Sequence, residues 1–108
     1  MSIEIWTVPD CPNEKLFRAR LRQALDAAGL RDVAFTTRVV TDQNEAERVG
    51  FTGSPTVLID GHDPFADEGR PAGLACRVYG TPEGGLAGAP SVGQLKEALA
   101  ASAVRGRP

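Results

Sequence analysis

The N-terminal third of the chain shows first a strand pattern and then a helix pattern. Residues 2–8 are rich in strand-forming residues and carry apolar side chains on both alternating faces, which is typical of a strand inside a sheet. The segment 9–12 then breaks the strand pattern with two prolines. Residues 13–28 predict an amphipathic helix, and Gly29 supplies its stop. The helix pattern rests on apolar residues at spacings of three, four and seven: Leu16, Phe17, Leu21, Ala24, Leu25 and Ala28.

The next segment predicts a second strand and a short helix. Residues 33–40 place apolar side chains at alternating positions, as a strand requires. Asp42 followed by Glu45 has the spacing of a capping box, which opens a helix. The pattern predicts that this helix ends at Gly50.

Two more strands are predicted in the C-terminal half. Residues 55–59 (PTVLI) form a compact apolar run that a turn signal, Asp60-Gly61, closes. Residues 62–73 are polar and contain prolines and glycines, so we expect a loop there. Residues 74–79 (LACRVY) predict a fourth strand, and residues 80–90 form a glycine-rich loop.

The chain ends in a predicted helix. Ser91 and Gln94 have the spacing of a second capping box. The helix after them has an apolar side made by Val92, Leu95, Leu99 and Val104. Neither a repeat nor a linker is present, so we expect one domain over residues 1–104 and a frayed tail over residues 105–108.

The order of elements predicts an α/β fold. Strand, helix, strand, helix, strand, strand and helix follow one another along the chain. Two strand–helix steps in succession imply parallel strands joined by right-handed crossovers. We expect the last two strands to pair with each other in the antiparallel direction.

Composition narrows the classes of partner. The chain has 108 residues, a net charge of −2 and an isoelectric point of about 5.3, which argues against nucleic-acid and anionic-membrane partners because both need a basic face. No apolar run is long enough to span a membrane, and the start lacks the features of a signal peptide, so the sequence predicts a cytoplasmic protein. Two cysteines are too few for a disulfide scaffold, and we expect both to be thiols.

Cys11 is the first candidate for chemistry. Pro12 follows it, and proline is favoured at the first position inside a helix. Cys11 is then predicted to be the N-cap, where free N–H groups and the helix dipole stabilise a thiolate. Lys15 and Arg18, in the next turn, would add to that effect. A thiolate is both a nucleophile and a ligand for soft metals.

If Cys11 is the N-cap, the role of Glu14 has two interpretations. At the third helical position its carboxylate completes a capping box with the N-cap backbone. Alternatively, it donates or accepts a proton beside the Cys11 sulfur. Its negative charge opposes the thiolate, so the two effects on Cys11 have opposite signs. Cys11 itself has an alternative as a buried and inert small hydrophobe.

Two segments resemble the thioredoxin-like superfamily: Cys11-Pro12 after the first strand, and residues 53–61 (GSPTVLIDG) at the third. The resemblance spans roughly residues 3–101 and implies a four-stranded mixed sheet of order 2-1-3-4 flanked by three helices. It also implies that Pro55 is cis and lies against the active cysteine, and that Ser54 offers backbone groups to a bound thiol or peptide. Pro12, Ser54 and Pro55 are the implied substrate-binding residues.

The chain departs from the redox members of that superfamily at one position. Those members carry C-x-x-C, whose second cysteine releases a mixed disulfide, whereas this chain reads C-P-N-E with Glu14 at the second position. Chemistry within this motif is therefore confined to a single thiol. The expected partner is a low-molecular-weight thiol or a protein thiol, and no cofactor is implied.

The chain is also similar to small bacterial thioredoxin-like proteins of the alkylmercury lyase-like kind. The resemblance rests on Cys11, Glu14 and Cys76, and it implies two thiolates that hold an organomercurial or another soft metal and a carboxyl group that protonates the leaving carbon. Strands one and four of such a sheet lie roughly 10 Å apart, which disfavours a Cys11–Cys76 disulfide. Cys76 shares a predicted face with Leu74 and Val78, which favours a packing role.

Two alternatives complete the list of candidates. The fold by itself confers no activity, so a non-catalytic binding module that lost its resolving cysteine stays open. His62 is the only histidine and lies near Asp60, Asp63, Asp67 and Glu68. One histidine among flexible carboxylates is typical of a solvated turn, although a metal-ligand role stays open.

Overall fold

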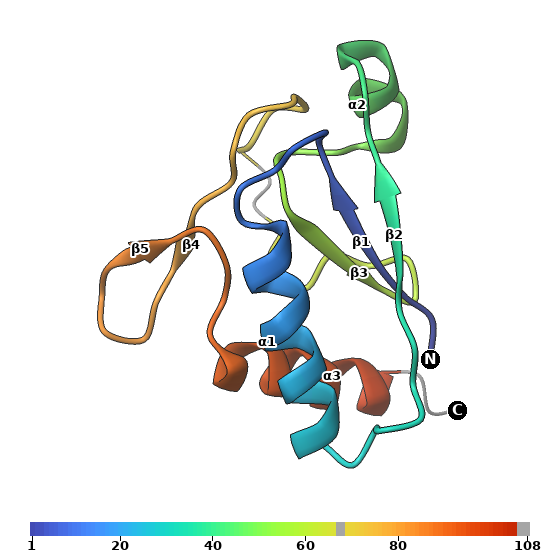
Figure 1. Cartoon of the computed structure of the whole chain (residues 1–108), viewed down its shortest axis with the longest axis vertical. Coiled ribbons are helices and arrows are strands. Elements are labelled where there is room, and N and C mark those ends of the chain that lie inside the picture. The colour runs from blue at the N-terminus through green and yellow to red at the C-terminus, as the bar shows by residue number, and fades with distance from the viewer. Residues whose placement is uncertain (67–68, 106–108) are drawn as a thin grey trace.

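Three helices, a three-stranded mixed sheet and a two-stranded sheet make up the described part of the chain (Figure 1). The computed structural model describes residues 1–66 and 69–105, with side chains through Ser102. The elements in chain order are β1 (Ile3–Thr7), α1 (Glu14–Ala27), β2 (Thr36–Val39), α2 (Gln43–Val49), β3 (Thr56–Ile59), β4 (Tyr79–Gly80), β5 (Leu86–Ala87) and α3 (Val92–Arg105). No helix in the described ranges is both long enough and apolar enough to cross a membrane.

The central strand is β1, as its two apolar faces predict. The main sheet has the order β2-β1-β3, with β2 parallel and β3 antiparallel to β1. Ile3 and Ile5 belong to a large core that also contains buried residues of α1 and α3. Trp6 and Val8 point the other way and pack with Ala46 of α2 in a smaller cluster. The helices therefore cover both faces of a three-stranded sheet.

The predicted four-stranded sheet of order 2-1-3-4 is wrong in two respects. The direction of β3 was expected to follow that of β1, but the two strands are antiparallel. The fourth strand does not join the sheet: the backbone of residues 74–79 forms a single parallel bridge, from Cys76 to Ser54, which precedes β3. Tyr79 and Gly80 pair instead with Leu86 and Ala87, so the last two predicted strands do not pair with each other. The resulting β4–β5 hairpin projects from the body of the molecule (Figure 1).

Arg77 gives the physical reason for this difference. The sequence pattern placed Cys76 and Val78 on the inner face, but the structure buries Arg77 and Tyr79 and leaves Cys76 and Val78 exposed. The Arg77 guanidinium meets Asp63 in an ion pair of 2.7 Å. A buried charge is tolerated when it is paired in this way, and the pairing reverses which residues of the segment face inward.

Helix capping follows the sequence signals. Asp42 accepts a hydrogen bond of 2.7 Å from the Glu45 N–H at the start of α2, and Gly50 ends that helix with a φ of +76°. Ser91 and Gln94 bond each other in both directions, at 3.1 and 2.8 Å, which confirms the second capping box. Arg105, which was expected to begin a frayed tail, is the last residue of α3. The rest of the predicted tail, residues 106–108, and the Val104 side chain lie outside the described residues.

Gly53 is required by a close approach of two segments. Its φ is +143°, and a Cβ built on it would lie 2.8 Å from the Arg77 Cβ. Gly53→Ala is therefore expected to lower the free energy of unfolding by about 2 kcal/mol, the order of the cost of a residue held in a disfavoured backbone region. Urea unfolding followed by the fluorescence of Trp6, the only tryptophan, measures this.

Gly93 is the matched control for this substitution. It lies in the first turn of α3, and the nearest atom to a Cβ there is 3.8 Å away. Gly93→Ala should raise stability by about 0.5–1 kcal/mol through helix propensity. Equal effects of the two substitutions would contradict the close approach at Gly53.

Candidate functional site

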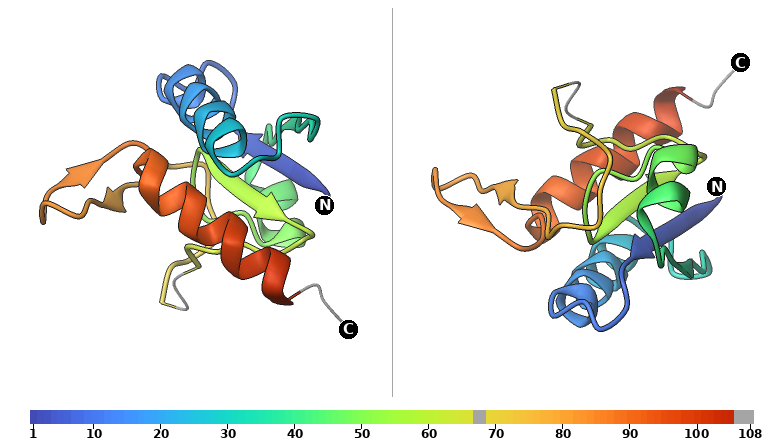
Figure 2. Two further views of the ribbon diagram at one scale, coloured as in Figure 1. Left: turned by 90° about the horizontal axis from the view of Figure 1, so that it is seen from below. Right: turned by 90° about the horizontal axis from the view of Figure 1, so that it is seen from above.

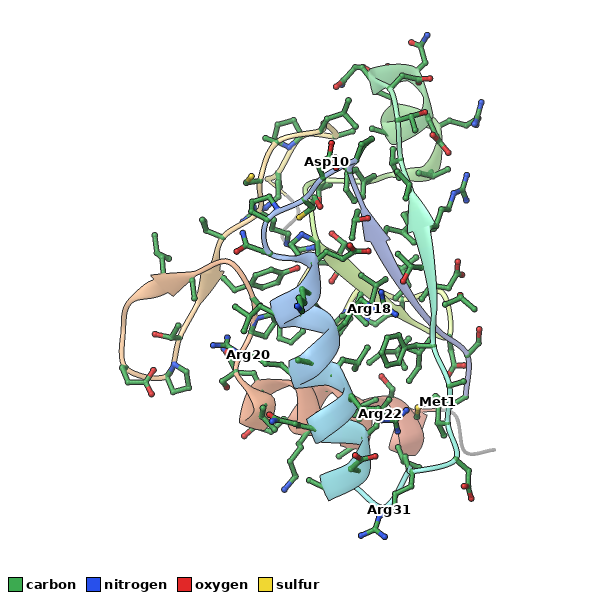
Figure 3. The ribbon with its side chains drawn as sticks, in the orientation of Figure 1. Met1, Asp10, Arg18, Arg20, Arg22 and Arg31 are labelled. Carbon is green, nitrogen blue, oxygen red and sulfur yellow. The ribbon has the colours of Figure 1, made fainter. Side chains whose placement is uncertain are left out.

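Cys11 lies in the turn that joins β1 to α1. This turn begins after Val8, and Asp10 takes a positive φ of 57° within it. Figure 3 labels Asp10 at the end of β1 that lies far from Met1. The Cys11 carbonyl accepts a bond of 3.3 Å from the Glu14 N–H, which closes a short turn before the helix begins. The thiol is free and partly buried.

The prediction that Cys11 is the N-cap is wrong by two residues. Asn13 is the N-cap, and its carbonyl accepts the first helical bond from the Phe17 N–H at 3.0 Å. An extra turn through Pro12 and Asn13 causes the difference. The hydrogen bond that closes this turn, from the Glu14 N–H to the Cys11 carbonyl, spans three residues and comes before the regular helical hydrogen bonds begin. Glu14 is accordingly the first helical residue rather than the third, and it forms no capping box.

The Glu14 carboxylate is not engaged by the protein. Its side chain is half-buried, and within the described part of the chain it has neither a hydrogen-bond nor an ion-pair partner. The structural alternative for Glu14, a bond back to the N-cap backbone, is therefore not formed. A free carboxylate stays one turn away from Cys11.

The Ser54–Pro55 peptide bond is cis, and both residues are buried. The Ser54 hydroxyl accepts a bond of 3.1 Å from the Val8 N–H, which ties it to the strand end that leads to Cys11. The Ser54 N–H donates to Ala75 at 3.0 Å, and the Ser54 carbonyl accepts from Arg77 at 2.9 Å. Because both backbone groups are committed to this segment, Ser54 has no free main-chain group for a bound thiol.

Val8, Ser54 and Cys76 lie in one row across three neighbouring backbones. The register that pairs Trp6 with Thr56 brings Val8 opposite Ser54, and a parallel bridge brings Cys76 opposite Ser54 on the other side. At the usual strand spacing, the Val8 and Cys76 backbones lie about 10 Å apart. Cys76 is a free and exposed thiol, so the predicted packing role for it is wrong.

The positions of the two cysteines and Glu14 bear on the soft-metal hypothesis. In residues 1–66 and 69–105, no three cysteine, histidine, aspartate or glutamate side chains are grouped to hold a metal ion. The soft-metal hypothesis for Cys11, Glu14 and Cys76 gains no support from this geometry and stays a prediction. His62 is exposed in the loop after β3, and two of the carboxylates near it in sequence, Asp67 and Glu68, lie outside the described residues.

Sequence reasoning missed the buried cluster around Arg77. The Arg77 side chain is 1% exposed and donates to the Asp63 carboxylate, to the Thr56 hydroxyl at 3.0 Å and to the Phe65 carbonyl. Its guanidinium also lies 4.8 Å from the centre of the Tyr79 ring. The available signal was Arg77 itself, a single charged residue inside the otherwise apolar run 74–79.

Tyr79 anchors the same cluster to the cis-proline. Its hydroxyl donates to the Pro55 carbonyl, and its ring meets Phe17 and Phe65 edge to face. Burial raises the pKa of the Tyr79 hydroxyl well above its ordinary value, and the nearby Arg77 charge offsets only part of that rise. The cluster thus holds Pro55 from the side of the large core.

The turn that carries Cys11 is also tied to the start of α3. Arg20 donates to the Ala89 and Pro90 carbonyls at 3.2 and 3.1 Å. Figure 3 shows Arg20 on the side of α1 that faces the connection between the hairpin and α3. A Cβ at Gly88 would collide with the side chain of Asn13, so the two segments are in direct contact.

Comparisons with protein-family models, with curated proteins and with solved structures find no match to this chain. The class of protein is therefore defined by the structure alone: a mixed α/β domain with two accessible thiols, one of them in the turn between the central strand and the first helix.

Ionisation of Tyr79 should require unfolding. A group whose pKa is raised on folding contributes stability that is full below its ordinary value, here 10.0, and is lost as the pH rises above it. Tyr79 is the only tyrosine, so the ultraviolet absorbance of tyrosinate reports it alone. We expect tyrosinate to appear together with the loss of helical circular dichroism; tyrosinate with a midpoint near pH 10 in a still folded protein would contradict this.

Removal of the Arg77 counterion should destabilise the fold strongly. Asp63→Asn leaves a buried guanidinium without its carboxylate, and breaking such a pair costs about 3 kcal/mol. Urea unfolding measures the loss. Asp32→Asn is the control, since Asp32 is exposed, and it should change stability by less than about 0.5 kcal/mol. Equal effects of the two variants would show that the ion pair is not stabilising.

Proposed function

We propose that this protein is a thioredoxin-like thiol exchange protein that acts through Cys11 with the help of an external thiol. The observation that carries the proposal is the place of Cys11: a free, partly exposed thiol in the turn after the central strand, next to a strand end bonded to the residue before a cis-proline. Folded proteins bury most cysteines that only pack. A partly exposed thiol at a strand–helix turn is better suited to chemistry.

The reaction needs one protein thiol and one external thiol. The Cys11 thiolate attacks one sulfur of a disulfide R–S–S–R′, a Cys11–S–S–R bond forms, and R′S⁻ leaves. A second thiol then attacks the Cys11 mixed disulfide at the R sulfur, so that R leaves as part of a new disulfide and Cys11 is regenerated. Electrons balance between the two disulfides, so no further reductant is required.

Glu14 is the proposed proton carrier. Its carboxylate has no protein partner in the described part of the chain, and its N–H is bonded to the Cys11 carbonyl, which keeps the two residues within one turn. The leaving thiolate needs a proton, and the incoming thiol must lose one. A carboxyl group beside Cys11 can donate the first proton and accept the second. Unlike a second thiol, it does not attack the mixed disulfide.

The proposed partner is a low-molecular-weight thiol or a protein thiol. Pro12 is exposed beside Cys11, while Pro55 is buried and held by Tyr79. Pro12 and Cys11 together are the proposed contact surface. The committed backbone of Ser54 argues for recognition through these side chains rather than through strand pairing.

Thiol exchange should depend on Cys11 and not on Cys76. The assay is the reduction of bis(2-hydroxyethyl) disulfide by glutathione, with the uncatalysed rate subtracted. Cys11→Ser should abolish the catalysed rate, and Cys76→Ser should retain most of it, although Cys76 is the more exposed thiol. Intact-mass measurement should then find the mixed disulfide on the Cys76→Ser protein at Cys11.

Two outcomes would overturn the proposal. If neither the parent protein nor Cys11→Ser exceeds the uncatalysed rate, the chain is better described as a binding module without thiol chemistry. If Cys76→Ser alone loses activity, the reactive centre is the other thiol. Circular dichroism of both variants checks that each is folded.

A further inference from the structure

A pocket of about 300 Å³ lies between the loop after β3 and helix α3. Figure 2 shows this loop passing alongside α3. His62 and Phe65 line the pocket from the loop, and Glu97, Ala98 and Ala101 line it from the helix. The hollow exists because two of the helix positions carry only a methyl group. Its volume is at the lower end of the range for small-molecule sites.

The pocket is distinct from the proposed exchange site. Its lining includes neither Cys11 nor Glu14. The two sites share one support, because the Phe65 ring packs on Tyr79, whose hydroxyl bonds to the Pro55 carbonyl. A ligand in the pocket would therefore occupy residues other than those proposed for thiol exchange.

Both walls of the pocket are held in place by other contacts. On the loop side, the Phe65 N–H donates to Asp63 at 2.9 Å, and the Phe65 ring meets Tyr79 with centres 5.6 Å apart. On the helix side, Gln94 donates to the Gly80 carbonyl at 2.8 Å. A site with walls fixed in advance loses little entropy when a ligand enters.

The lining has a definite chemical character. Phe65 and the two alanines supply an apolar surface, Glu97 supplies a carboxylate, and His62 supplies an imidazole. No lysine or arginine is among the described lining residues. We infer that the pocket binds a small amine that carries an apolar ring, with the ring against Phe65 and the ammonium group toward Glu97. A charge-assisted hydrogen bond to the carboxylate would select cations over anions.

The test uses three probes of similar size: phenethylamine, 2-phenylethanol and phenylacetate. Binding is followed by amide chemical shifts of the isotope-labelled full chain. Phenethylamine should give saturable shifts confined to the residues around the pocket, with a dissociation constant on the order of 1 mM, as expected for a fragment. The alcohol should bind about tenfold more weakly, and the anion should give no saturable shift.

Matched variants separate this site from general charge effects. Glu97→Gln should weaken phenethylamine about tenfold and leave the alcohol unchanged, since it removes only the charge. Glu83→Gln, an exposed change in the hairpin, should have no effect. Ala101→Leu fills the hollow from an exposed helix position and should abolish binding of both probes without loss of fold.

Several results would overturn the inference. Shifts by phenethylamine that map elsewhere, equal binding of the amine and the anion, or equal effects of Glu97→Gln and Glu83→Gln would each do so. Retained binding in a folded Ala101→Leu protein would also show that the hollow is not the site. None of these readouts depends on thiol exchange. The inference about the pocket is therefore tested independently of the role of Cys11.

Discussion

The buried guanidinium of Arg77 organises the C-terminal half of this molecule. It fixes the loop after β3 through Asp63 and Phe65, contacts β3 through Thr56 and lies over the ring of Tyr79. A buried charge needs several partners at once, and the partners here come from the loop after β3, from β3 and from β4. The Arg77 side chain therefore joins this loop to β3 and to the start of β4, where a fourth strand was expected, and Tyr79 in turn bonds to the Pro55 carbonyl.

The same constraint shapes the surroundings of the thiols. Because Arg77 faces inward, Cys76 faces outward, and the backbone on both sides of Cys76, the Ala75 carbonyl and the Arg77 N–H, bonds to Ser54. Ser54 in turn bonds to Val8 at the end of the central strand. The environment of Cys11 on this side is thus set by hydrogen bonds that originate in a segment more than sixty residues away along the chain.

Much of the fold could be predicted from local patterns. The two apolar faces of residues 2–8 identified the central strand, and the pairs Asp42 with Glu45 and Ser91 with Gln94 identified two helix starts, because these signals act within a few residues. The direction of β3 could not be derived in the same way. It depends on how the chain after α2 returns to the sheet, and no local periodicity records that.

The errors at the candidate site have a common origin. Pro12 was predicted to be the first helical residue because proline is favoured at that position. In the structure, a turn closed by the bond from the Glu14 N–H to the Cys11 carbonyl separates Cys11 from the helix. The inner face of residues 74–79 was assigned by hydropathy, but a long-range ion pair decided it. Both errors arose where a contact or a turn outweighed an average propensity. Both cysteines are free thiols, as expected, while the exposure of Cys76 was not foreseen.

The bonds from Arg20 to the Ala89 and Pro90 carbonyls, with Asn13 against Gly88, join the reactive turn to the cap of α3. Helix α1 is consequently fastened to the segment that leads into α3, in addition to packing against α3 itself. A substituent on the Cys11 sulfur that displaced α1 would therefore have to break these bonds and disturb the C-terminal helix as well.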